Sequence, residues 1–268
     1  MLRNIRDWKG VVFTLIIATI QMSLFFLVEN LFIVIVAVAA LVPFQFSASA
    51  LNHNHHHCMT FRSVWLNRIY ECVLFLQTGT TPFTWTLHHN IGHHERFLDQ
   101  STDTSPWKKR NGDVMGRTWY CLRNTVMIYP EAFRVGLTHR PIFYRFLAFL
   151  GVSSLLLTAL ILGSPLKACL IFVLPMTIAL FFLVDTTYGH HAGLDTDNPY
   201  EATHNVLDPL YNLFSWNLGF HTAHHLRPGL HWTSLPEFHE KIRAKIPDAL
   251  MMDEWNTKRL VKKFLSRG

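Results

Sequence analysis

The sequence has few charged residues and few cysteines for its length of 268 residues. Asp, Glu, Lys and Arg together make up 16% of it, whereas about 25% is typical of soluble domains. The four cysteines, Cys58, Cys72, Cys121 and Cys169, show no paired spacing. This excludes a disulfide framework and a cysteine set of the ferredoxin type, so we expect reduced thiols.

Several short motifs are also missing. The sequence has no GxGxxG, the fingerprint of dinucleotide binding, and no HPGG haem motif. It also lacks the HExxH pattern of zinc hydrolases, in which a glutamate lies between the metal ligands. Nothing suggests nucleic-acid binding. The net charge of +6 instead fits a protein lying against an anionic cytoplasmic leaflet.

Long apolar segments take the place of these features, at about 11–28, 31–46, 143–162 and 168–184. The first has no charge over about 18 residues, or ~27 Å of helix, which is close to the thickness of a bilayer core. Only Glu29 and Asn30 separate the first two segments, and a short turn around Gly163 to Lys167 separates the last two. We predict an all-α integral membrane protein, a single domain over residues 1–268, whose four transmembrane helices form two hairpins.

The distribution of positive charge predicts the orientation of these spans. Lys and Arg are dense before the first span, between the second and third, and after the fourth, but scarce at the hairpin tips. The positive-inside rule therefore places both termini and the central segment in the cytoplasm. Residues 47–62 continue the second span as a helix, and 65–85 and 207–220 have the mixed composition of interfacial helices. We expect a cytoplasmic helical cap.

Three histidine runs lie outside the apolar segments and near this one face: HNHHH at 53–57, HHNIGHH at 88–94 and HTAHH at 221–225. Neutral imidazole is a common ligand of iron, copper, nickel and zinc. Histidines three or four residues apart on an α-helix share a face, so each run can direct two rings toward one point. Three such runs supply more ligands than one metal ion uses, and they therefore predict a two-metal site in the cap.

The spacing within the runs selects the ligands. The predicted ligands from the three runs are His53, His57, His89, His93, His94, His221, His224 and His225. Two further candidates are His191, directly after the fourth span, and His204, shortly before the third run. His56 is an alternative to His57, and His88, five residues from His93, fits one α-helical face poorly; we expect both beside the ligands. The isolated His139, His231 and His239 receive no role.

Nearby carboxylates are expected to accept hydrogen bonds from the ligating rings, because neutral ligands leave the metal charge uncompensated. The strongest candidates are Asp185, Glu201 and Asp208, with Asp99, Asp195 and Asp197 also close in sequence. Glu201 and His204 form an ExxH pair. Soluble di-iron carboxylate bundles need two such pairs on separate helices, and the sequence has only one, so we do not expect that fold.

These features resemble the membrane fatty acid desaturase and hydroxylase superfamily, the histidine-box non-haem di-iron enzymes. The resemblance covers nearly the whole chain, with two boxes after the first hairpin and one after the second. NLGFHTAHH at 217–225 looks like the family's third-box context, and YGHHAGL at 188–194 resembles its extra histidine site. The first box departs from many desaturases because no acidic residue follows its first histidine, and the second has the longer HxxxHH spacing.

The resemblance implies two iron ions bound almost wholly by histidine, with O2 as co-substrate, that oxidise an unactivated C–H bond of a lipid chain. It also implies a separate electron donor of the ferredoxin or cytochrome b5 type. Fatty acyl desaturation is the first expectation; hydroxylation, alkene-forming decarboxylation and carotenoid or isoprenoid oxidation use the same boxes. A metal transporter is an alternative of another class, but it should hold ligands near the middle of its spans, where this sequence has no histidine.

Overall fold

The computed structural model describes residues 1–253, and nearly all of their regular structure is helical. The α-helices are α1 (Trp8–Leu27), α2 (Leu31–His57), α3 (Val64–Thr78), α4 (Arg117–Gly136), α5 (Arg140–Gly163), α6 (Pro165–Ala168), α7 (Leu174–His191), α8 (Pro209–Ser215), α9 (His221–Leu226) and α10 (Leu235–Ile242). Short 3-10 or π-helices are η1 (Ile5–Asp7), η2 (Thr86–His94), η3 (Cys169–Val173), η4 (Trp232–Ser234), η5 (Arg243–Lys245) and η6 (Asp248–Leu250). In this part of the chain two short strands, β1 (Asn205–Val206) and β2 (Met251–Met252), pair in parallel. The predicted all-α class is confirmed.

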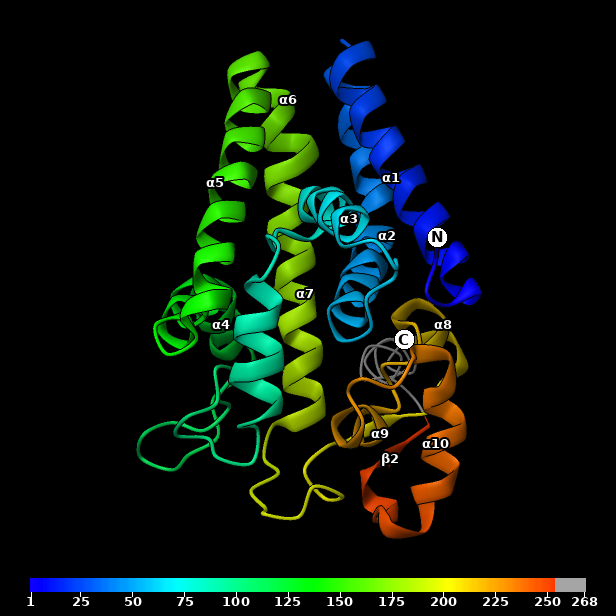
Figure 1. The fold of residues 1–268 in the computed structure, drawn as a ribbon, viewed down its shortest axis with the longest axis vertical. Coiled ribbons are helices and arrows are strands. Elements are labelled where there is room, and N and C mark those ends of the chain that lie inside the picture. The colour runs from blue at the N-terminus through cyan, green and yellow to red at the C-terminus, as the bar shows by residue number, and fades with distance from the viewer. Residues whose placement is uncertain (254–268) are drawn as a thin grey trace, which may run out of the picture.

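Four helices are long and apolar enough to cross a membrane, and they run along the long axis of the molecule (Figure 1). They are Ile5–Leu27, Leu31–His57, Arg140–Gly163 and Pro165–His191. The predicted four spans in two hairpins are therefore confirmed. The second and fourth helices extend beyond the apolar segments, to His57 and His191. An apolar run marks only the part of a helix that suits lipid. The helix itself continues into the polar residues that follow, because its backbone hydrogen bonds do not require apolar side chains.

The two hairpin turns lie at the end of the molecule far from the cap. Asn30 ends the first turn by accepting hydrogen bonds from the backbone N–H groups of Phe32 and Ile33, which caps α2. Pro165 begins the helix after the second turn, at a position where its missing N–H costs nothing. Lys167 then donates to Glu29 over 2.7 Å. The tips of the two hairpins are thus joined by an ion pair.

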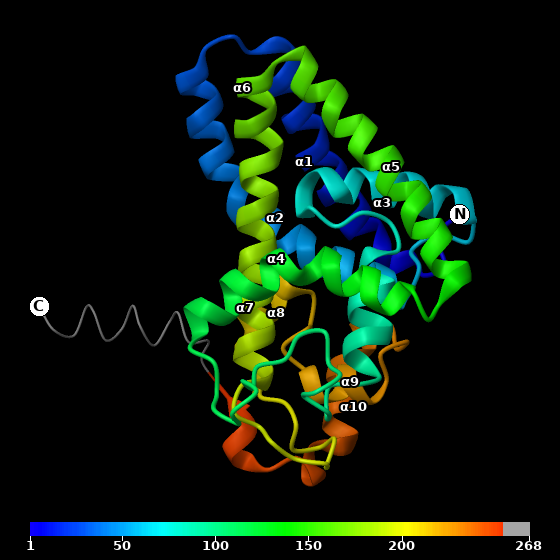
Figure 2. The ribbon, with the colours of Figure 1, turned by 90° about the vertical axis from the view of Figure 1, so that its left-hand side faces the viewer.

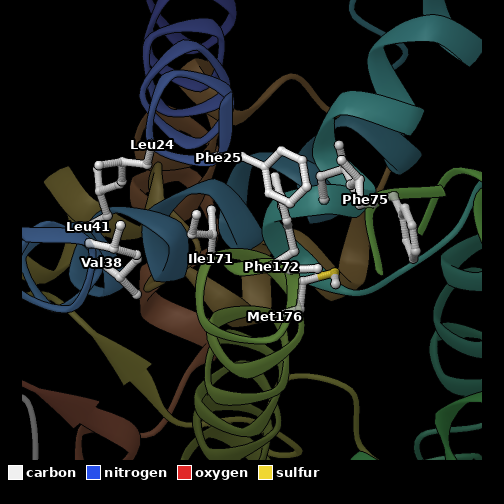
Figure 3. Packing of buried hydrophobic residues seen from close by; sticks show 12 residues of the cluster. Leu24, Phe25, Val38, Leu41, Phe75, Ile171, Phe172 and Met176 are labelled. Carbon is white, nitrogen blue, oxygen red and sulfur yellow. The ribbon is translucent and has the colours of Figure 1, made fainter. Parts of the chain in front are cut away.

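The spans pack around a cluster of buried apolar side chains (Figure 3). Leu24 and Phe25 from α1 meet Val38 from α2, and Phe172 and Met176 come from the fourth span. On the outer faces, large apolar side chains remain exposed, including those of Phe26, Phe32, Leu155 and Leu162. Apolar surface on both sides is expected of helices whose surroundings are lipid.

Two helices, α3 and α4, run across the long axis (Figure 2); α3 packs among the spans, against α1, α2 and α7, and α4 packs against α7. α3 confirms the helix expected in the segment 65–85, and it exposes Trp65 and Ile69. α4 exposes Trp119, Leu122 and Val126 on one side. Residues 95–116, between η2 and α4, contain no helix. α4 also contacts η2 and so joins the spans to the second histidine run.

The remainder of the cap is built from the segments after α7, and it folds around its own small core. Ala223 of α9 packs with Leu235 and Ile242 of α10 in one apolar cluster. α8 contacts α2, and the Ser47 hydroxyl of α2 donates to the Phe214 carbonyl over 2.7 Å. The third histidine run is thereby held beside the lower end of α2, where the first run lies.

Candidate metal centre

The histidine runs meet where the spans enter the cap. The first run occupies the last two turns of α2, the second lies on η2, His190 and His191 end α7, and the third run makes up most of α9. Eight of the predicted ligands fall into two groups whose ligand atoms each lie within 4.8 Å of one another. The first group is His53, His57, His89, His94 and His224; the second is His93, His191 and His225.

The second run has a local geometry that differs from the expected α-helix. η2 is a π-helix, and a π-helix bonds residues five apart, so that His89 and His94 lie one above the other. Their Nε2 atoms are 3.0 Å apart and belong to the first group. His93 is directed instead at the second group. The wider turn thus distributes one short run between two sites.

In the first group, ring nitrogens from three parts of the chain face each other. The Nε2 atoms of His94 and His224 are 2.9 Å apart, although 130 residues separate them. The rings of His53 and His89 are 4.4 Å apart between centroids, and His89 is stacked on the buried indole of Trp85. The His57 Nε2 and His53 Nδ1 atoms are buried and have no hydrogen-bond partner.

Near the second group, hydrogen bonds fix the tautomers of three rings. The Nδ1 atom of His93 lies 2.9 Å from Asp103 Oδ1, that of His191 lies 3.1 Å from the Ala202 carbonyl, and that of His221 lies 3.3 Å from the Leu218 carbonyl. A carboxylate or carbonyl oxygen only accepts, so each Nδ1 carries the hydrogen. In the neutral ring each Nε2 is then a bare lone pair.

These three bare nitrogens point at one another. The Nε2 atoms of His93 and His191 are 3.3 Å apart, and those of His191 and His221 are 3.0 Å apart. No hydrogen is available between them, so the contact brings lone pairs together and is unfavourable without a cation. His225, with both ring nitrogens buried and unbonded, lies beside them. This donor set fits a bound divalent transition-metal ion.

Burial keeps the rings in the form that binds metal. It lowers the pKa of His89, His94, His221, His224 and His225 well below the ordinary value, and the neighbouring histidines lower it further. Each of these histidines is therefore neutral near pH 7, with a lone pair free to coordinate.

The remaining predicted residues lie outside the two groups. His56 and His88 are buried with both ring nitrogens unbonded. His204 is half-buried, and its backbone exchanges two hydrogen bonds with His190, but its ring belongs to neither group. Among the isolated histidines, His231 pairs with Asp7 and His239 is buried in the cap core beside Phe220.

The three carboxylates expected around the ligands have other partners. Asp185 pairs with Arg117 through two short hydrogen bonds. Glu201 is exposed and accepts from Asn198, and Asp208 accepts the first backbone N–H groups of α8. Helix capping and a peripheral ion pair are common uses of such residues. Their closeness to the histidines in sequence did not reveal these roles.

Sequence analysis missed the carboxylate that does contact a ring of the second group, Asp103. It is buried in the loop after η2, where its Oδ1 also accepts from the Ser105 N–H. His190 was also missed: its ring stacks on His221 at 3.9 Å and is held by the His204 carbonyl and the Tyr211 hydroxyl. The only signal for Asp103 was an acidic residue ten positions after His93 in a polar loop.

A small cavity of about 30 Å³ lies against both groups. His53 and His89 of the first group and His93 of the second line it, together with the apolar Phe46 and Leu183 on the side of the spans. The two helices α2 and α7, which supply those apolar side chains, pack directly against each other. The histidine clusters therefore border a cavity that is apolar on its membrane side.

Comparison with known proteins agrees with this geometry. A family model described as "Fatty acid desaturase" matches residues 29–255, which is most of the chain and includes every histidine run. No curated protein matches this sequence. With four apolar helices, histidine clusters at their cap end and this match, the chain belongs to the fatty acid desaturase family.

Proposed function

We propose that this protein catalyses the O2-dependent oxidation of an unactivated C–H bond in a lipid acyl chain, most simply a desaturation, at a di-iron centre held by histidine. The observation that carries the proposal is the convergence of bare Nε2 atoms from His93, His191 and His221 beside a second histidine group. Family membership supports lipid oxidation, and the donor set supports the metal.

The residues that would hold the two irons follow from the two groups. His53, His57, His89, His94 and His224 would bind one ion, and His93, His191, His221 and His225 the other. Two bound irons would supply the oxidant derived from O2 that an unactivated C–H bond requires and that side chains alone cannot provide. Asp103 and the carbonyls of Ala202 and Leu218 hold the rings of the second group in the ligating tautomer.

The protein's own contribution to the reaction is to position the acyl chain of the substrate and to exclude water from the site. Phe46 and Leu183 line the membrane side of the cavity and favour a methylene segment over water. Exposing a methylene to water costs ~0.8 kcal/mol, so an apolar wall that continues from the spans would let the acyl segment reach the site from the bilayer without that cost. Thr186, Thr187 and Tyr211 line the same cavity and bring hydroxyl groups to its wall.

Electrons for the reaction would come from a separate donor of the ferredoxin or cytochrome b5 type. The sequence carries no haem motif, no dinucleotide fingerprint and no cysteine set for a cluster.

The positive-inside rule supports a cytoplasmic cap, because Arg3, Arg6, Lys9 and Arg62 lie near the cap. The positive charge at the hairpin tips comes from Lys167, which pairs with Glu29.

Two other functions fit the geometry less well. A transporter should hold its ligands near the middle of the spans, whereas both histidine groups lie where α2 and α7 end. A zinc hydrolase needs a general-base carboxylate beside the metal, and neither histidine group contains a carboxylate within residues 1–253.

Mass spectrometry of lipids from a host that expresses the chain tests the proposal. A new double bond is expected in host acyl chains, absent in cells expressing His93→Ala at the same membrane level. A hydroxyl group or a shortened terminal alkene would identify the alternative reactions of the same centre. Unchanged lipids and isoprenoids with an iron-loaded, membrane-inserted wild type and a reductant supplied would refute the proposal.

A further inference from the structure

A groove of about 240 Å³ opens on the surface beside the start of α1, away from the histidine groups. Its lining consists of Ile5, Arg6, Trp8, Lys9, Trp232 and Thr233. Figure 1 shows the N-terminus at the end of α1 that meets the cap, and the Arg6 hydrogen bond to Thr233 joins it to η4. The groove therefore lies where the first span passes from the apolar bundle to the polar cap.

Hydrogen bonds hold the walls of this groove in place. The indole N–H of Trp232 donates to Asp7 Oδ1 over 3.0 Å, and the same oxygen lies 2.9 Å from His231 Nε2. The Arg6 guanidinium donates to the Thr233 hydroxyl over 3.1 Å. One aromatic wall and one cation are thus fixed before any ligand binds, which reduces the entropy lost on binding.

The groove carries a net positive charge, from two cations against one adjacent carboxylate, Asp7. Arg6 and Lys9 are both exposed, and neither forms an ion pair within residues 1–253. The groove lining contains no acidic residue, and the adjacent Asp7 carboxylate is directed at His231 and Trp232. An anion in the groove would therefore meet two unpaired cations, and a guanidinium is well suited to bind phosphate oxygens.

The apolar residues around these cations indicate a lipid and not a soluble anion. Ile5 is 76% exposed and Trp8 is 50% exposed, directly at the start of a helix long enough to span a membrane. Tryptophan with adjacent Lys or Arg is typical of the boundary between headgroups and acyl chains. At that depth the neighbouring molecules are phospholipids, with phosphate at the level of the cations.

We propose that this groove binds the phosphate headgroup of an anionic phospholipid in the leaflet on the cap side. Arg6 and Lys9 contact the phosphate, the Trp232 indole forms the inner wall, and Ile5 and Trp8 lie against the upper part of the acyl chains. The site does not depend on the proposed oxidation, since none of its residues lines the cavity beside the histidine groups.

Lipid binding to the purified full-length protein tests the site. Native mass spectrometry with added phosphatidylglycerol or phosphatidylcholine gives an apparent Kd for each lipid. The wild type is compared with Arg6→Gln/Lys9→Gln and with the charge-matched control Lys109→Gln/Lys241→Gln, which changes exposed cations elsewhere on the cap. Each cation at an anionic surface contributes about 1 kcal/mol, so the groove variant should bind phosphatidylglycerol about 30-fold more weakly.

The relative affinities of the three proteins for the two lipids support or overturn the proposed site. Selective loss of phosphatidylglycerol binding in the groove variant, with the control unchanged and circular dichroism unaltered, supports the site. Equal loss in both variants would show a general charge effect and overturn it. Equal affinity of the wild type for the two lipids would also overturn it. Competition by glycerol 3-phosphate at the same concentration as lipid would show a free-phosphate site instead.

Discussion

His93 donates a hydrogen bond from Nδ1 to Asp103 Oδ1, with the two atoms 2.9 Å apart and both side chains buried. This contact fixes the tautomer of His93 and therefore directs its Nε2 lone pair toward His191, 3.3 Å away. A carboxylate behind a ligating histidine also raises the basicity of the ring. Asp103 is thus a positioning residue for the second histidine group.

Asp103→Asn should lower metal affinity by about 10–100-fold, because the neutral amide binds the Nδ1 hydrogen more weakly and can also offer a donor. Competition with a chelator, followed by iron analysis of the purified protein, measures the loss. Asp113→Asn, an exposed residue of the same loop, is the matched control. If Asp103→Asn retained iron as tightly as the control, the positioning role would be wrong.

Removing one ligand should affect the two histidine groups differently. The first group has five members, so His57→Ala leaves four histidines. The second group has fewer members, so His191→Ala leaves it with fewer histidines than the altered first group keeps. We expect His191→Ala to lose most of one metal equivalent and oxidation activity, and His57→Ala to keep more of its metal. His139→Ala, whose ring contacts the Val135 carbonyl at the end of α4 and the Thr138 hydroxyl, should change neither. Equal metal retention in His57→Ala and His191→Ala would contradict the assignment into two groups.

Gly92→Ala should displace the second histidine run. A Cβ atom at this position would lie 2.3 Å from Thr104 Cγ2 and 3.1 Å from the Leu87 carbonyl. Thr104 cannot move freely, since its hydroxyl donates to the His88 carbonyl over 2.6 Å and its N–H to the Gly92 carbonyl. Overpacking of this kind costs about 1–3 kcal/mol, measurable as a lower thermal midpoint together with reduced iron content.

The control for that substitution is Gly151→Ala on α5, where a Cβ atom would have no neighbour within 4 Å. It should leave both the thermal midpoint and the iron content unchanged. A Gly92→Ala protein as stable and as iron-rich as this control would show that η2 can shift without disturbing the metal centre.

Iron-edge X-ray absorption should reveal no short metal–metal distance of the kind found in carboxylate-bridged pairs. Within residues 1–253 both ligand groups consist of histidine alone, and Asp103 contacts the outer nitrogen of a ring. No side chain placed here can therefore bridge two ions through a carboxylate. A short iron–iron vector in the resting protein would contradict the ligand set.

Much of the fold and the chemistry could be predicted from the sequence because they depend on composition and local order. The four apolar segments predicted four spans, and Asn30 and Pro165 mark the turns between them. Eight of the ten histidines predicted as ligands lie in the two groups, and His221 lies beside the second. Histidine runs can be recognised from the sequence because every histidine carries a ligand nitrogen whatever the fold.

Other features could not be predicted because they depend on the shape of the backbone. The π-turn of η2 sends His94 and His93 to different groups, whereas on an α-helix His89 would share a face with His93. Asp103 carried no motif, and its role arises only because the loop folds back over η2 through the Thr104–Gly92 hydrogen bond. Conversely, Asp185, Glu201 and Asp208 lie near histidines in sequence but bind elsewhere.

The order of amino acids alone determined that this chain has four apolar segments and that its histidine runs lie outside them, because hydrophobicity and donor chemistry belong to each residue type. Only the tertiary structure decided which rings share a site, which nitrogen of each ring is bare and which carboxylate holds it. Those relations join atoms up to 130 residues apart, and their geometry is set by helix packing and by hydrogen bonds that no local pattern encodes.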